Sequence, residues 1–258
     1  MVRVKLKKGK RRLNVQWKFF DIITIIVVIA FFTATFCIET DKTISSDFIN
    51  TILSETEIDK NDFITAEYKF QNVLIKFPNL NNNSIISNRD EINKFIENNS
   101  LEILNIYNEK DVNNGNLKLE IDYKIEYYSK TFLSITFSGM GYVQRTAHPN
   151  NLFYTLNVDL HNLQLIKLED MVKIDEHFLN LFRKSIKNSE TEPNKNAGVY
   201  FDDIPNEIIL HNLKTESNLF ENREVYSYFT NKHINIVYLM PYVVGSYTII
   251  KIRSSVFL

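Results

Sequence analysis

The fold is decided by the stretch from Leu117 to Phe137, which reads LKLEIDYKIEYYSKTFLSITF. In its first half apolar and charged side chains alternate, and a second alternating run begins at Phe132 after a short turn near Ser129 and Lys130. Alternation with a period of two is typical of a strand that buries one face. A tight turn between two such runs predicts an antiparallel pair. An antiparallel sheet is therefore the first expectation.

Further strands and several helices are expected on both sides of this pair. The other strands cover Tyr68 to Phe77, Leu152 to Leu160, Val225 to Thr230, His233 to Leu239 and Tyr247 to Val256. The helices cover Asp90 to Tyr107, Asp175 to Ser185 and Pro205 to Leu213. Strands in meanders with single helices between them predict an α+β fold, in which antiparallel sheets carry helices packed on one face.

The N-terminal segment predicts a membrane anchor. An apolar run without charge extends from Ile22 to Ile38, and only basic charged residues lie between Arg3 and Lys18. At 1.5 Å per residue this run, lengthened upstream, spans roughly the ~30 Å hydrocarbon layer. Positive charge stays on the cytoplasmic side. We therefore expect a single-pass protein of the cell membrane, with a cytoplasmic tail at 1–18 and a transmembrane signal anchor at 19–38.

The remaining chain is expected outside the membrane, as a stalk at 39–62 and an extracytoplasmic α+β domain at 63–258. A cleaved export signal stays open as an alternative, with cleavage after Thr35 or Cys37. Signal peptidase favours small side chains, and the bulky Phe36 between these positions favours the uncleaved anchor. The same Phe36 argues against a lipidated Cys37, because a small residue normally precedes a lipidated cysteine.

Composition limits the partners of the expected ectodomain. The chain has 30 Lys and Arg and 31 Asp and Glu. Many of the basic residues lie in the N-terminal tail, so acidic residues outnumber basic ones in the expected ectodomain. Such a domain is attracted to cationic partners, and we expect no binding of nucleic acid. Cys37 is the single cysteine, so the ectodomain contains neither a disulfide nor a thiol nucleophile.

Residue patterns typical of catalysis are missing from the sequence. Its 5 histidines fall in separate predicted elements, without the spacing of a zinc site, and there is no Gly-x-Ser-x-Gly motif or phosphate-binding loop. The prediction is a protein that is not an enzyme and that has no catalytic residue, metal site or cofactor.

Two groups of residues are candidates for ligand binding. They are Arg145, His148 and Asn150 in one loop, and Tyr238, Tyr242 and Tyr247 around a Pro-containing turn. A loop held by a rigid sheet is a common place for a binding site, and tyrosine is common in interfaces. Each group also has a structural interpretation, in which the loop polar groups bond to the backbone and the tyrosines pack.

The order of motifs resembles a known family. These motifs are LSITFSGMGY from Leu133, TAHPN from Thr146, FYTLNVDL from Phe153, LIKLEDM from Leu165 and a closing segment around Pro241 and Tyr242. The sequence is similar to the extracytoplasmic domain of unknown function shared by RsiV-type lysozyme-sensing anti-sigma factors and PdaC-type peptidoglycan deacetylases.

The resemblance implies a noncatalytic sensor or binding domain for an envelope ligand. That ligand is either a cationic protein such as lysozyme or the glycan of peptidoglycan. The alternative is a peptidoglycan-modifying enzyme or an accessory subunit of a deacetylase. A sigma factor is a doubtful partner, because the tail at 1–18 is much shorter than the sigma-binding segment of the anti-sigma relatives.

Overall fold

The computed structural model describes residues 60–82, 88–187, 197–215, 225–241 and 246–254. The expected tail, the expected span from Ile22 to Ile38 and most of the stalk lie outside these residues. Within the described ranges, no helix is long and apolar enough to cross a membrane. Every described residue belongs to one unit of the chain, 44–258.

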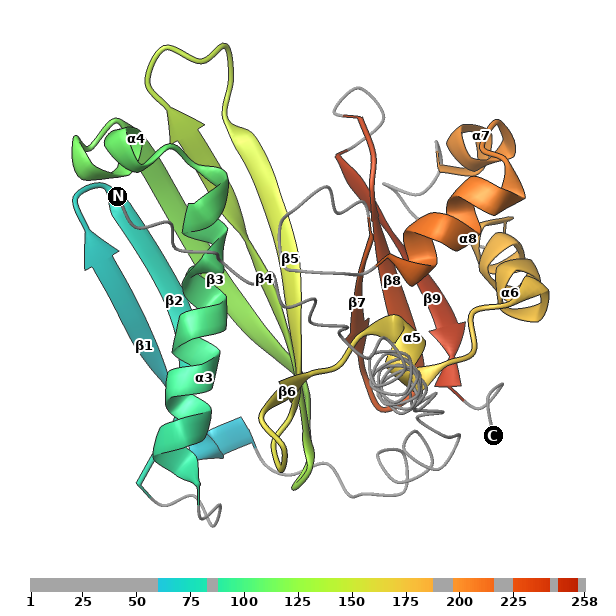
Figure 1. Ribbon diagram of the computed structural model, residues 1–258, viewed down its shortest axis with the longest axis horizontal. Helices are drawn as coiled ribbons and strands as arrows, with labels where there is room; N and C mark the ends of the chain where they lie inside the picture. Colours follow the sequence, from blue (N-terminus) through green and yellow to red (C-terminus); the bar gives the residue numbers. More distant parts are fainter. Residues whose placement is uncertain (1–59, 83–87, 188–196, 216–224, 242–245, 255–258) are drawn as a thin grey trace, which may run out of the picture. The chain divides into compact units, whose positions relative to one another are not determined.

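Six strands form the larger sheet, and their spatial order follows the chain (Figure 1). They are β1 (Phe63–Phe70), β2 (Val73–Leu80), β3 (Leu117–Tyr128), β4 (Phe132–Val143), β5 (Asn150–Asp159) and β6 (Gln164–Leu165). All neighbours are antiparallel except β2 and β3, which run parallel with Val73 opposite Leu119. The expected β3–β4 hairpin is confirmed.

Three further strands form a separate antiparallel sheet in the order β7-β8-β9. They are β7 (Val225–Phe229), β8 (His233–Leu239) and β9 (Tyr247–Arg253). Each strand begins at the residue that the alternating pattern predicts.

The helices are short and lie between strands in the chain, except η1, which precedes β1. They are η1 (Lys60–Asp62), α3 (Arg89–Leu101), η2 (Glu102–Ile106), α4 (Glu109–Asn113), α5 (Leu168–Met171), α6 (Glu176–Lys187), α7 (Ala197–Asp202) and α8 (Asn206–Lys214). The three expected helices are confirmed in α3, α6 and α8, although the first changes to 3-10 geometry after Leu101. The fold is therefore α+β, with mainly antiparallel sheets and several helices.

Two hydrophobic clusters hold the described elements together. One joins the larger sheet to α3, through Ile92 and Ile96, and also contains Tyr226, Tyr228 and Val237 of the smaller sheet. The other joins one face of the smaller sheet to α5–α8, and it also contains Phe132 of the larger sheet. The strands thus divide into two sheets, and each sheet has its own helices.

A buried hydrogen-bond network connects the two sheets. The Ser134 hydroxyl donates to Asn157 Oδ1 at 2.7 Å and accepts from the N–H of Phe229 at 2.9 Å. The Asn157 side chain donates in turn to the carbonyl of Ser227 at 2.9 Å. Buried polar groups are stable in a protein interior when they have partners. This network therefore fixes β7 against β4 and β5.

The single strand expected from Tyr68 to Phe77 is wrong, because the structure has a hairpin there. β1 and β2 flank a turn at Gln71 and Asn72, and Gln71 has a φ of 52°. Their apolar residues continue to alternate, but the step from Phe70 to Val73 is three residues and not two. The alternation of apolar residues therefore changes phase at the turn.

Pro78 lies inside β2, although the expected strand ends one residue earlier, at Phe77. In an antiparallel pair, hydrogen-bonded and non-bonded residue pairs alternate. Since the N–H of Asn81 donates to the carbonyl of Asp62 at 2.8 Å, the pair of Thr65 and Pro78 is a non-bonded one. The missing N–H of Pro78 therefore faces away from β1, on the side where β3 pairs with β2 only as far as Ile75.

Candidate functional site

Three of the predicted site residues lie at the end of the β4–β5 hairpin, which projects beyond the neighbouring strands in Figure 1. Arg145, His148 and Asn150 are all exposed, and Arg145 has a φ of 75°. The N–H and hydroxyl of Thr146 donate to the carbonyl of Val143 at 3.1 and 2.8 Å and close the turn. The structure therefore brings these three residues together on one turn.

Tyr247 lies beside Phe153 of β5. The sequence predicts Phe153 as part of a strand but not as a site residue. The ring centroids of Tyr247 and Phe153 are 4.9 Å apart, and those of Phe153 and Tyr228 are 6.4 Å apart. Tyr247 and Phe153 are half-buried. Phe153 lies three residues from Asn150 along β5, or roughly 10 Å at the rise of a strand. The aromatic group is thus a neighbour of the hairpin turn.

Met140 extends this aromatic group on the same face of the larger sheet. It pairs with Asn151 in the register that pairs Ser138 with Phe153, and successive odd or even positions share one face of a strand. Met140 is 51% exposed. We call the exposed Met140 and the half-buried Phe153 and Tyr247, together with the buried Tyr228 beside Phe153, the aromatic surface.

A carboxylate with fixed orientation lies beside the aromatic surface. Glu126 occurs where the β3–β4 register shifts, and its carboxylate accepts from Thr136 Oγ1 at 3.1 Å and pairs with Lys124 Nζ at 2.8 Å. Burial raises the pKa of Tyr228 to about 12, and the negative charge of Glu126 adds to this shift. The Tyr228 hydroxyl therefore stays protonated at neutral pH.

The other two predicted tyrosines do not join this surface in the described structure. Tyr238 is only 1% exposed, its hydroxyl accepts from Asn212 Nδ2 at 2.6 Å, and its ring packs edge-on against Phe201. It has a packing role and lacks the exposure that a recognition residue needs. Tyr242 lies outside the described residues.

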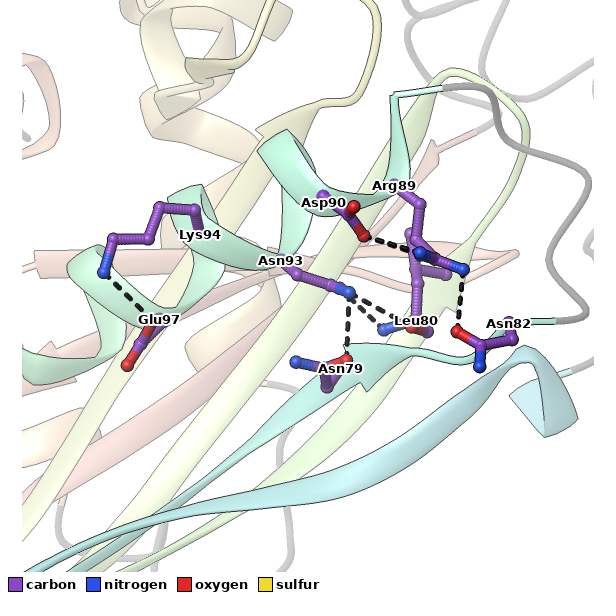
Figure 2. Close-up of a pocket in the computed structure, with 8 residues that line it drawn as sticks. All are labelled: Asn79, Leu80, Asn82, Arg89, Asp90, Asn93, Lys94 and Glu97. Carbon is purple, nitrogen blue, oxygen red and sulfur yellow. Dashed lines mark hydrogen bonds and ion pairs between the residues drawn. The ribbon is translucent and has the colours of Figure 1, made fainter.

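A polar pocket of about 340 Å³ lies on another part of the larger sheet, between the end of β2 and the first turns of α3 (Figure 2). It is lined by Asn79, Leu80, Asn82, Arg89, Asp90, Asn93, Lys94 and Glu97. Sequence reasoning missed this pocket, because the residues that form it come from two segments that meet only in the fold.

The charge of the described part differs from that expected for the whole ectodomain. The described residues contain as many Lys and Arg as Asp and Glu. The acid excess comes from residues 39–59, 188–196 and 216–224. No group of three His, Cys, Asp or Glu that could hold a metal ion occurs among the residues that the structure describes.

Comparisons with known proteins give structural neighbours in the DUF3298 family. No protein-family model matches the chain, and no curated protein matches it. A DUF3298 protein from Pseudomonas aeruginosa PAO1 is 14% identical, covers 79% of this chain and 93% of its own, and has a TM-score of 0.46. A DUF3298 protein from Bacteroides fragilis NCTC 9343 is also 14% identical. It covers 76% of this chain and 90% of its own, with a TM-score of 0.39. No ligand, partner or activity is transferred from either neighbour to this chain.

Proposed function

We propose that this protein is a membrane-anchored, noncatalytic binding domain for a ligand of the cell envelope. The ligand is either the glycan of peptidoglycan or a cationic protein of the lysozyme type, as the resemblance to the anti-sigma and deacetylase ectodomains implies. In this proposal Met1–Lys18 is cytoplasmic, Ile22–Ile38 crosses the membrane and the α+β domain is outside.

The observation that carries the proposal is the aromatic surface beside the β4–β5 turn. Phe153 and Tyr247 each expose part of a ring, Met140 is largely exposed, and the polar residues of the turn lie at one end. Exposed apolar groups next to polar ones are typical of binding surfaces. Aromatic rings give much contact area for little loss of side-chain entropy.

The two ligand classes differ in their expected response to salt. A cationic protein would be attracted by the acidic segments, above all residues 39–59, and salt screens such attraction over a Debye length of ~10 Å at 0.1 M. A neutral glycan would bind through contact and hydrogen bonds, which depend little on salt. Deleting 39–59 should therefore weaken binding of a cationic protein and leave binding of a glycan unchanged.

The test is a calorimetric titration of the fragment that begins at Glu39 with lysozyme and with soluble muropeptides, at low and moderate salt. Both hydrophobic clusters lie within this fragment. Tyr247→Ala should weaken binding about tenfold, the effect of losing one aromatic anchor. Val199→Ala is the control, because Val199 is 72% exposed on α7, outside the aromatic surface. Absence of binding to either ligand would refute the proposal.

A further inference from the structure

We propose that the pocket between β2 and α3 binds a neutral sugar unit of an envelope glycan. This inference rests on the glycan branch of the proposed function, but it assigns a site separate from the aromatic surface. The pocket volume of about 340 Å³ is at the small end of the ~300–1,000 Å³ typical of ligand sites. A single sugar unit is a ligand of that scale.

The floor of the pocket is the side-chain amide of Asn93, and hydrogen bonds to the backbone of Leu80 fix its orientation. Asn93 Oδ1 accepts from the N–H of Leu80 at 2.7 Å, and Asn93 Nδ2 donates to the carbonyl of Leu80 at 3.1 Å. The same Nδ2 donates to Asn79 Oδ1 at 2.9 Å. Because Asn79 must present its oxygen to this donor, its NH2 group is left for the pocket.

The guanidinium group of Arg89 orients the side chains of Asn82 and Asp90 in the wall of the pocket. Arg89 Nη1 donates to Asn82 Oδ1 at 2.8 Å, while Nε and Nη2 contact Asp90 Oδ1 at 2.8 and 2.7 Å (Figure 2). Arginine has donors and no acceptor, so Asn82 must present its oxygen to Arg89 and its NH2 group elsewhere. The second carboxylate oxygen of Asp90 has no partner among the described residues.

The charges in the pocket are already paired with one another. Arg89 pairs with Asp90, and Lys94 pairs with Glu97 at 3.2 Å. A charged ligand would therefore find no opposite charge that is unpaired within the lining. What remains is a set of amide donors from Asn79 and Asn82 and a carboxylate acceptor from Asp90.

A sugar unit matches this set of groups. Its hydroxyl groups both accept and donate, and an N-acetyl carbonyl accepts from an amide NH2. The bonds around Asn93 and Arg89 hold the lining side chains in place before a ligand arrives, which reduces the entropy lost on binding. The pocket is thus preorganised for a neutral ligand with several hydroxyl or amide groups.

The experiment is an NMR titration of the fragment from Glu39, isotope-labelled at asparagine, with chitotetraose as a neutral N-acetylglucosamine oligomer. We expect the side-chain NH2 resonances of Asn79 and Asn82 to shift and saturate. Asn82→Ala should weaken binding about fivefold, as expected for one hydrogen bond. Asn151→Ala, an exposed residue of β5 beside the aromatic surface, should leave the affinity at the pocket unchanged.

The other outcomes distinguish failure of the pocket assignment from failure of the proposed binding function. Shifts confined to Asn150 and Asn151 would overturn the pocket assignment while leaving glycan binding intact. Saturable shifts at Asn79 and Asn82 with inorganic phosphate would overturn the neutral ligand class. No shift at any asparagine, with lysozyme still bound in calorimetry, would overturn the sugar site and retain the proposed binding domain.

Discussion

At the scale of single residues, Gly141 is a site of close approach. A Cβ at this position would overlap the hydroxyl of Tyr107 on the segment after η2. That hydroxyl is buried without a hydrogen-bond partner among the described residues, and burial raises the pKa of Tyr107 to about 12. β4 therefore accommodates Tyr107 through the absence of a side chain at Gly141.

Gly141→Ala should lower the free energy of unfolding by about 1–3 kcal/mol, since overpacking a filled interior costs that much. Tyr107→Phe should recover part of this loss, because it removes the overlapping oxygen. The matched control is Gly139→Ala, whose Cβ would overlap the backbone carbonyl of Glu120. Urea unfolding of the single and double variants measures the coupling. Equal effects of Tyr107→Phe in both backgrounds would contradict this account.

A second residue-scale prediction concerns the start of α6. The N–H of Phe178 donates to Asp175 Oδ1 at 3.1 Å, and this bond, with a smaller effect of Lys173, lowers the pKa of Asp175 below its usual value. A lowered folded-state pKa gives stability that is present above the unfolded pKa of ~3.9 and is lost as the pH falls through the folded value.

Asp175→Ala should therefore cost about 1 kcal/mol of unfolding free energy at neutral pH, as for the loss of a helix cap. The difference between wild type and variant should narrow below about pH 4. Chemical denaturation at a series of pH values measures it. A difference that stays constant at acid pH would show that the carboxylate charge has no role at this helix start.

At the scale of elements, the contact between the sheets depends on Asn157. Asn157→Ala leaves the carbonyl of Ser227 and the hydroxyl of Ser134 without this partner. The expected loss of unfolding free energy is about 1–3 kcal/mol in total, because two buried hydrogen bonds are removed and each contributes about 0.5–1.5 kcal/mol. Asn151→Ala on the same strand is exposed and should change stability by less than about 0.5 kcal/mol. Equal melting curves for the two variants would contradict the role of the network.

The elements also show how far sequence patterns predict this fold. Period-two alternation located β3 most clearly, because β3 buries only one face along most of its length. β4, β7 and β8 were located as well, although both of their faces are largely buried. It merged β1 with β2, because a two-residue turn keeps apolar residues nearly in phase. With that hairpin missed, the strand–helix–strand unit from β2 through α3 to β3, and with it the parallel pair, was missed as well.

The candidate site was predictable only in part for a related reason. The turn at Arg145–Asn150 is visible as a polar segment between strands, and Tyr247 begins a strand. Which face of a strand meets solvent depends on the sheet packed against it. Tyr238 therefore proved to be core, while Phe153 lies beside Tyr247 of the smaller sheet. The amide pocket requires residues that only the fold brings together.

At the scale of the whole molecule, charge is distributed unevenly along the chain. The described part is balanced in charge, and the acidic segments are 39–59, 188–196 and 216–224. In the proposed arrangement the acidic segment 39–59 connects the membrane to the domain. Attraction of a cationic ligand would then be strongest close to the membrane, while the aromatic surface provides the specific contacts.

The most direct test of the central claim is hydroxyl-radical footprinting of the full-length chain in lipid nanodiscs, with and without saturating lysozyme or muropeptide. The account predicts that the bound ligand lowers the oxidation of the exposed Met140 and of the half-buried Phe153 and Tyr247. Phe70 on β1, which is 38% exposed, should be oxidised equally in both states. Binding that protects Phe70 and leaves the aromatic surface reactive would contradict the account.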